Sequence, residues 1–180
     1  MVAKETTLEP QGPDDLTAYT GTTPPETVAD SVDAISNVEL STPVAPVPGN
    51  TFLIRSVLCG RFFTLLDGKI VLGQQDGCSS HWNCVENKYW LGFKNLASGN
   101  YLGHSGGTKS DLRCSAQRYG GYEYFAVRPV GGEAYVLPTT FWENLSTVGI
   151  KKAMGVESLV TFNNRSVSDG LIWEFFKVQL

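Results

Sequence analysis

Side-chain types that bind transition metals gather in one short stretch, Cys78-Ser-Ser-His81-Trp-Asn-Cys84. Thiolate and imidazole groups are the donors that tetrahedral zinc prefers, and Cys59 or Cys114 could supply a fourth ligand. Residues three apart on an extended strand point to opposite faces, however, so His81 and Cys84 would not converge on one ion. We therefore expect no metal site in this stretch.

Side chains for catalysis are also few. A cysteine nucleophile needs a histidine base and a third group that orients it. The chain has only two histidines, His81 and His104, and nothing in the spacing supplies that third group. Glu123 and Glu174 occupy the same place in two similar segments, so we expect them to face outward and lie far apart, unlike a glycosidase pair. The sequence predicts a protein that is not an enzyme and has no catalytic residue, metal or cofactor.

The segment Trp82-Asn-Cys-Val-Glu is the strongest sign of internal order. It returns in degenerate form as Tyr122-Glu-Tyr-Phe-Ala and as Trp173-Glu-Phe-Phe-Lys. Segments that recur at similar spacing indicate a repeat architecture. The alignment of the three copies places Trp82, Cys84 and their counterparts Tyr122, Tyr124, Trp173 and Phe175 in one core, where cysteine serves as a small apolar residue.

The two ends of the chain differ in composition. Residues 1–49 contain eight acidic residues and one basic residue, a net charge of −7, and they lack Phe, Trp and Cys. Residues 50–180 contain thirteen basic and ten acidic residues, a net charge of +3. A segment rich in charge and poor in large apolar residues cannot offset its chain entropy by burial. We expect a disordered acidic tail over 1–49 and one folded domain over 50–180.

From Phe52 onward the pattern is one of short strands separated by glycine turns. Asp67-Gly68 is typical of a two-residue hairpin turn. Strands with turn signals at this spacing indicate an all-β barrel or sandwich. Repeats at about 50–88, 89–130 and 131–180, with four strands each, predict a single β-trefoil, a six-stranded barrel capped by three hairpins. Equivalent residues in the first two repeats include Ile54 and Phe93, Arg55 and Lys94, Gly60 and Gly99, Phe62 and Tyr101, and Leu72 and Cys114.

Within this fold, two groups of proteins share local motifs with the chain. Ser98-Gly-Asn-Tyr-Leu102, Cys59-Gly-Arg-Phe-Phe63 and Tyr122-Glu-Tyr-Phe-Ala-Val127 resemble the fascin-like, actin-crosslinking β-trefoils. Phe52-Leu-Ile-Arg-Ser and Ile172-Trp-Glu-Phe-Phe-Lys-Val also resemble a group of uncharacterised single-trefoil proteins of filamentous fungi. The first resemblance implies a binding module whose loops hold a protein partner, such as a cytoskeletal filament.

Two other functions stay open. A lectin-like trefoil would bind glycans, but the Gln-x-Trp signature of ricin-type lectins is missing from all three repeats, where Ser80, Gly120 and Leu171 stand in place of Gln. The long loop over 139–157 would suit a trefoil protease inhibitor. For the ligand-binding residues we select Trp142, Lys151 and Lys152, which lie in this loop.

Charge and hydropathy limit the partners and the location. A net charge of +3 without clustering does not indicate nucleic-acid binding. No apolar run of 18 residues predicts a membrane span, and the N-terminus lacks the apolar region of a secretory signal. We expect a cytoplasmic monomer with four reduced cysteines.

Overall fold

The computed structural model describes residues 40–107, 109–141, 144–163 and 172–179. They form strands joined by tight turns, together with the short helix α1 (Gly77–Ser80) and the 3-10 turn η1 (Gly121–Glu123). Among the described residues, no helix is long and apolar enough to cross a membrane. The strands are β1 (Thr51–Ser56), β2 (Phe62–Leu66), β3 (Lys69–Gly73), β4 (Trp82–Asn87), β5 (Trp90–Asn95), β6 (Tyr101–His104), β7 (Leu112–Ala116), β8 (Arg128–Gly131), β9 (Ala134–Val136), β10 (Pro138–Phe141), β11 (Asn144–Ala153), β12 (Val156–Phe162) and β13 (Ile172–Val178).

Strand pairing closes the barrel. Strand β1 pairs with β13 on one side and β4 on the other, and β4 continues to β5. Phe125 then bridges Leu91 of β5 to Thr139 of β10, and the adjoining β9 pairs with β13. Every barrel strand therefore has a neighbour on both sides, which removes the free edges of an open sheet.

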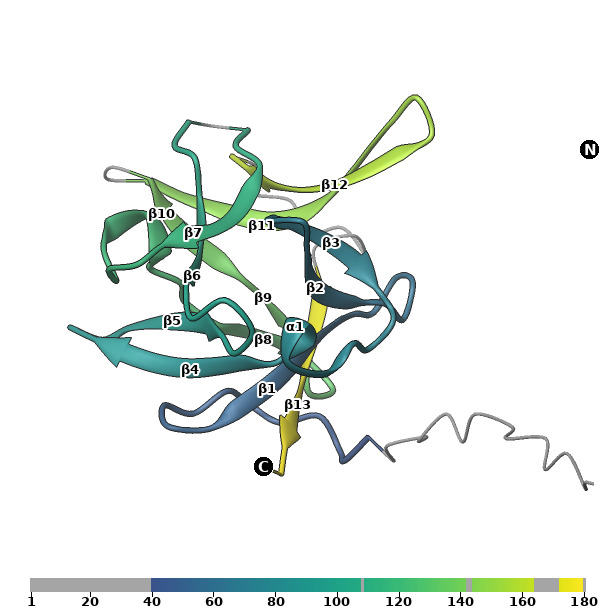
Figure 1. Ribbon diagram of the computed structural model, residues 1–180, viewed down its shortest axis with the longest axis vertical. Coiled ribbons are helices and arrows are strands. Elements are labelled where there is room, and N and C mark those ends of the chain that lie inside the picture. The colour runs from purple at the N-terminus through teal and green to yellow at the C-terminus, as the bar shows by residue number, and fades with distance from the viewer. Residues whose placement is uncertain (1–39, 108, 142–143, 164–171, 180) are drawn as a thin grey trace, which may run out of the picture. The chain divides into compact units, whose positions relative to one another are not determined.

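Three hairpins cap one end of this barrel, namely β2–β3, β6–β7 and β11–β12. Figure 1 shows them in its upper half, above β1, β4, β5 and β13. The first hairpin turns at Asp67-Gly68, where both residues have positive φ (49° and 76°), as the sequence predicts. The expected fold, an all-β single β-trefoil, is confirmed.

Two tryptophans fill equivalent places in the first and third repeats. Trp82 and Trp173 are both fully buried. The indole Nε1 of Trp82 donates to the Phe63 carbonyl (3.0 Å), and that of Trp173 donates to the Val148 carbonyl (3.2 Å). A buried indole N–H needs such an acceptor. Cys84 also lies in the main core cluster, so its predicted role as a small apolar residue is confirmed, and Cys114, the equivalent of Leu72, lies in the same cluster.

The middle repeat is displaced by one residue from the predicted alignment. Tyr122 is 43% exposed and Tyr124 is partly exposed, whereas Glu123 and Phe125 are buried. Phe125 packs against Phe93 (ring centroids 5.8 Å apart), which is the contact that Phe175 makes from the third repeat (5.7 Å). Neighbouring strand residues face opposite sides, so a one-residue shift exchanges the buried and exposed sets. The predictions of a buried Tyr122 and Tyr124 and of an outward-facing Glu123 are therefore wrong.

Local glycines accommodate this shift. The 3-10 turn η1 follows Gly120, whose N–H donates to Oε2 of Glu123 (3.2 Å). A Cβ on Gly103 would lie 2.8 Å from Oε1 of Glu123, so the missing side chain leaves room for the carboxylate. Glu174 does face outward as predicted, and it pairs with Arg55 (2.7 Å).

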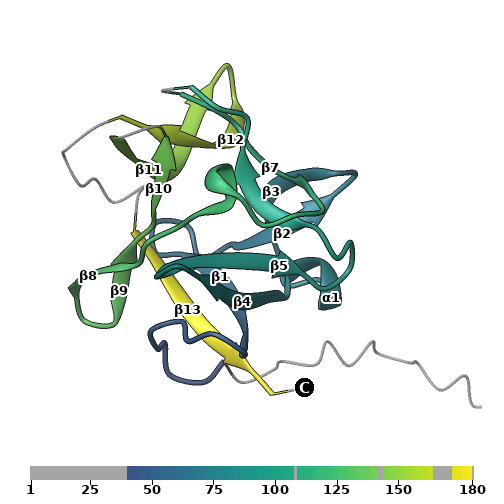
Figure 2. The ribbon, with the colours of Figure 1, turned by 90° about the vertical axis from the view of Figure 1, so that its left-hand side faces the viewer.

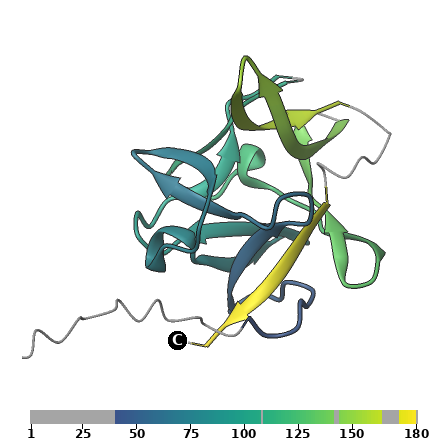
Figure 3. The ribbon, with the colours of Figure 1, turned by 90° about the vertical axis from the view of Figure 1, so that its right-hand side faces the viewer.

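The compact unit begins before the predicted boundary at residue 50. The N–H of Val44 donates to the Phe175 carbonyl (2.8 Å), Pro46 is buried, and Leu40 packs against a small cluster that includes Phe176. In Figure 3 the segment that precedes β1 loops beside β13. Residues 40–49 thus belong to the domain, which corrects the tail boundary. The rest of the predicted acidic tail, residues 1–39, lies outside the described residues.

Candidate functional site

The hairpin β4–β5 ends in a turn of unusual composition. Lys88 and Tyr89 form its tip with φ values of 50° and 70°, a left-handed conformation that usually requires Asn, Asp or Gly. For other residues this conformation costs about 1–2 kcal/mol each. The side chain of Tyr89 is 96% exposed, and Trp90 follows it as the first residue of β5. The hairpin therefore presents two consecutive aromatic residues at its end.

Trp90 lines a pocket of about 370 Å³. The other lining residues are Gly121 and Tyr122 of η1, Tyr124, and Thr140 of β10. We call these five residues the aromatic pocket. Figure 2 views the molecule from the side where β4 and β5 approach β10. The pocket thus joins the start of the second repeat, its closing segment and the first part of the third repeat.

The aromatic rings of Trp90 and Tyr124 are parallel. Their planes differ by 3° and their centroids are 6.1 Å apart. This separation exceeds the ~3.5–4 Å of carbon–carbon contact, so the two rings are not in full face-to-face contact. Tyr122 adds a third, 43% exposed ring at the pocket. Three rings around one hollow can hold a ligand that has flat apolar faces.

Tyr119 fixes the position of the two parallel rings. Its hydroxyl donates to the Trp90 carbonyl (2.7 Å), and its ring meets that of Tyr124 edge to face with centroids 5.0 Å apart. The ring of Tyr119 lies over Gly92, where an added Cβ would be 2.4 Å away. Gly92 is needed here because any side chain would push the Tyr119 ring outward.

Thr140 fixes the other wall of the pocket. Its hydroxyl donates to the Gly121 carbonyl (2.6 Å), and its own carbonyl accepts from Nε2 of His104 (2.8 Å). The N–H of Gly106 donates to Nδ1 of His104, so the imidazole carries its proton on Nε2. Burial lowers the pKa of His104, and a second proton would break the bond from Gly106. The ring of His104 also packs edge to face on Tyr122 (5.2 Å). His104 therefore packs within the fold and helps to hold this wall of the pocket.

Glu123 lies directly behind the pocket wall but does not line it. Burial raises the pKa of its carboxyl group, and the Gly120 N–H and the charge of Arg113 only partly oppose this effect. Among the residues that the structure describes, the pocket lining includes no carboxylate, imidazole or thiol. The aromatic pocket therefore offers apolar faces and hydroxyl and peptide groups, which suit binding rather than acid–base chemistry.

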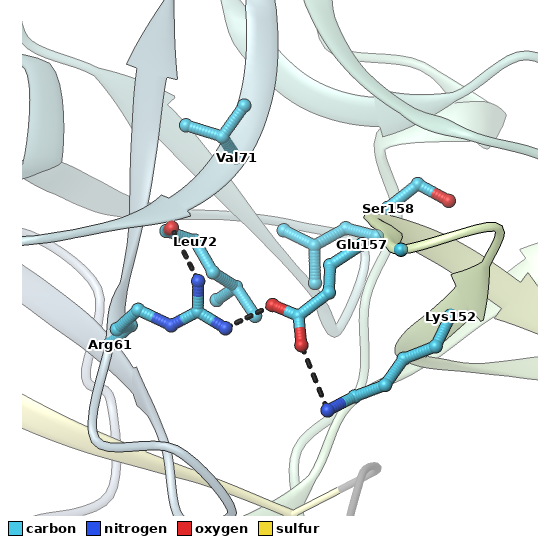
Figure 4. A pocket seen from close by; sticks show the side chains of 8 residues that line it. Arg61, Val71, Leu72, Lys152, Glu157 and Ser158 are labelled. Atoms are coloured by element: carbon cyan, nitrogen blue, oxygen red, sulfur yellow. Dashed lines mark hydrogen bonds and ion pairs between the residues drawn. The ribbon is translucent and has the colours of Figure 1, made fainter.

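A second pocket, of about 470 Å³, lies between β3 and β12. Arg61 and Lys152 both pair with Glu157 across it, the latter at 2.9 Å, as Figure 4 shows. Paired charges leave little capacity for a further ligand. We call this the ion-pair pocket.

The structure describes two of the three residues selected from the sequence for ligand binding. Lys152 lines the ion-pair pocket, Lys151 is an exposed residue of β11, and Trp142 lies outside the described residues. Neither of the two lysines lines the aromatic pocket. The aromatic residues of the pocket, Trp90, Tyr122 and Tyr124, are not among the three, although the pair Gly120-Gly121 beside two tyrosines could have indicated a surface turn.

Two cysteines are buried and two are exposed. Cys84 and Cys114 belong to the core, and Cys59 and Cys78 are exposed. Within the described ranges, no three His, Cys, Asp or Glu side chains lie close enough together to hold a metal ion.

Neither a protein-family model nor a curated protein sequence matches the chain. Its fold is similar to several solved structures. A designed threefold-symmetric protein, ThreeFoil, is 11% identical with a TM-score of 0.62, over 71% of this chain and 99% of that one. The ricin B-like lectin of Macrolepiota procera in complex with lactose is 15% identical with a TM-score of 0.61, over 73% and 98%. SeviL bound to asialo-GM1 saccharide is 12% identical with a TM-score of 0.57, over 72% and 98%.

Proposed function

We propose that the protein is a non-enzymatic binding module that recognises a glycan in the aromatic pocket. The parallel rings of Trp90 and Tyr124 carry this proposal. A pyranose ring has an apolar face of C–H groups and a rim of hydroxyls, so it packs on an aromatic face while its rim bonds to polar groups. The hydroxyl of Tyr122 and the backbone of Gly121 stand at the same pocket and supply such groups.

The pocket has the size of a small-ligand site. Its volume of about 370 Å³ lies within the range of roughly 300–1,000 Å³ that is usual for such sites. Tyr119 and Thr140 hold two of its walls through their hydroxyl groups, so little side-chain freedom is lost when a ligand binds. A preformed pocket of this kind favours one or two sugar units over a large protein epitope.

The solved structures favour the glycan-binding alternative over a cytoskeletal partner. Two of them are described with a bound sugar, lactose in one and the asialo-GM1 saccharide in the other. The identity is below one fifth in both, so the likeness supports the shared scaffold, and the sugar site proposed here depends on this chain's own residues. The absence of Gln-x-Trp from all three repeats is consistent with a site built from different aromatic residues.

The aromatic pocket provides no specific contact that supports the fascin-like interpretation. A protein partner such as a cytoskeletal filament would need a larger, flatter surface than this pocket offers. Co-sedimentation with filamentous actin tests that interpretation directly. Binding to actin without binding to any glycan would replace the present proposal.

A glycan array with the full chain is the first test, followed by calorimetric titration with the strongest ligand. Trp90→Ala and Tyr124→Ala should each weaken binding by about tenfold or more, as the loss of a stacked aromatic contact does. Lys152→Ala, which changes the ion-pair pocket instead, is the matched control and should bind normally. The proposal fails if no glycan binds, or if Lys152→Ala removes binding and the two aromatic variants retain it.

A further inference from the structure

The hairpin β11–β12 carries a second surface, which the glycan proposal does not use. Its strands contain ten and seven residues, and Figure 1 shows its end projecting past the other cap hairpins. We define the hairpin tip as residues 153–156, Ala-Met-Gly-Val. We propose that this tip and its adjoining lysines bind the surface of an anionic lipid bilayer.

The tip exposes apolar side chains to solvent. Met154 is fully exposed and Val156 is 67% exposed, and Ala153 and Gly155 beside them are also exposed. Four consecutive exposed apolar residues are unfavourable for a soluble surface unless they have a function. This observation indicates that the tip contacts another molecule when the protein functions.

The backbone at the tip strengthens this inference. Met154 has a φ of 49° and Gly155 a φ of 77°, which is the two-residue turn that favours Asn-Gly or Asp-Gly. Methionine is strained in this conformation, and its side chain gains no contact that would offset the strain. Strained positions of this kind concentrate at functional sites. Asn would adopt this conformation with less strain. The presence of methionine is therefore best explained by a contact that its side chain makes with another molecule.

The residues beside the tip are mainly basic. Lys151 and Lys152 are exposed on β11 immediately before the tip. Glu157 follows the tip on β12 and pairs with both Lys152 and Arg61 (Figure 4). Three cations and one carboxylate give these four residues a net charge of +2. Lysine side chains can keep their ammonium groups at the level of lipid phosphates while an apolar tip enters the interface.

The shape of the tip favours a bilayer over a folded protein partner. A stable protein interface buries about 800 Å² on each side and needs complementary shape, and four residues at a turn cannot supply that area. A bilayer interface accepts a convex apolar tip without complementary shape, and its affinity grows with the buried apolar area and with anionic lipid. One short tip predicts weak, reversible binding that salt reduces.

Vesicle co-sedimentation of the full chain tests this proposal. The probes are vesicles of pure phosphatidylcholine and vesicles that also contain phosphatidylserine, at low and at physiological salt. We expect binding to the phosphatidylserine vesicles at low salt, less at physiological salt, and little to phosphatidylcholine alone. These pure phospholipids carry no sugar, so the result is independent of the aromatic pocket.

Met154→Asn is the decisive variant because it separates lipid binding from folding. It should raise the midpoint of urea unfolding, since Asn suits the left-handed conformation, and it should lower the vesicle partition coefficient by about tenfold. Lys151→Glu should lower the partition coefficient by about tenfold through charge. Leu66→Asn, at the exposed end of the β2–β3 hairpin, is the matched control and should bind as the unmodified chain does.

Two results would overturn the lipid proposal. One is no sedimentation of the unmodified chain with phosphatidylserine vesicles at low salt, which would leave a protein as the partner of the tip. The other is equal binding by Met154→Asn and the unmodified chain, which would show that the methionine side chain does not enter the interface.

Discussion

The rings of Trp90 and Tyr124 lie parallel within 3° at the aromatic pocket, although 34 residues separate them in the chain (124 − 90). Leu91 and Phe125, the next residue in each segment, form the bridge that joins β5 to the closing segment of the second repeat. Successive residues of an extended segment point to opposite faces, so the Trp90–Tyr124 pair faces outward and the Leu91–Phe125 pair faces the core. The pocket therefore depends directly on the register of this bridge.

Paired alanine substitutions test that register. Phe125→Ala should lower the free energy of unfolding by about 3–5 kcal/mol, because it empties a fully buried core position. Tyr124→Ala should cost only about 1 kcal/mol, because its side chain is partly exposed. Urea unfolding measures both. If Tyr124→Ala were as destabilising as Phe125→Ala, Tyr124 would have to be a core residue, which would contradict this register.

Glu123→Gln tests the buried carboxyl group behind the pocket. Because the folded pKa of Glu123 is raised, its contribution to stability is present below the ordinary Glu pKa and is lost as the pH rises through the folded pKa. At neutral pH the buried carboxylate therefore opposes folding. The neutral amide should unfold at a higher temperature than the unmodified chain at pH 7, and the difference should shrink toward pH 4. A Gln variant that is less stable at pH 7 would show that the charge of Arg113 outweighs burial.

The four cysteines should differ in their reaction with iodoacetamide. Partial burial acts to raise the pKa of Cys59, but the backbone N–H and the guanidinium of Arg61 outweigh it and lower the pKa. Burial raises the pKa of Cys84 to about 12 and also raises that of Cys114. Since the thiolate is the nucleophile, Cys59 should be alkylated fastest at neutral pH and the two buried thiols only after unfolding.

Mass spectrometry of peptides from partly labelled protein measures these rates. Arg61→Gln should slow the labelling of Cys59, and the exposed Cys78 serves as the reference in both proteins. Labelling of Cys84 in the folded protein at the rate of Cys59 would contradict its place in the core.

The fold could be predicted from the sequence because equivalent core and turn residues recur in successive repeats. Ile54 and Phe93 were paired as equivalents, and both are fully buried. The glycines Gly60 and Gly99 were also paired, and both have a φ of 69° at their turns. Apolar strand residues and positive-φ turns leave clear signals in a single sequence, so the trefoil could be recognised.

The aromatic pocket was not predictable because it forms where the symmetry fails. The spacing of Tyr122 and Tyr124 matches that of Trp82 and Cys84, so the sequence favours the symmetric register. The true register depends on the 3-10 turn η1 and on the space that Gly103 leaves for Glu123. Both are tertiary features. Two signals in the sequence point to the surface here: the pair Gly120-Gly121, and the hydroxyl groups of the two tyrosines, which favour contact with water.

Titration of Trp90→Ala with the glycan that the unmodified chain binds best tests the central claim most directly. The glycan proposal predicts that affinity falls by about tenfold or more while the unfolding midpoint changes little, because a stacked aromatic contact is lost from a partly exposed site. Lys152→Ala should keep full affinity in the same experiment. Unchanged affinity in a folded Trp90→Ala variant would contradict the claim that the aromatic pocket is the glycan site.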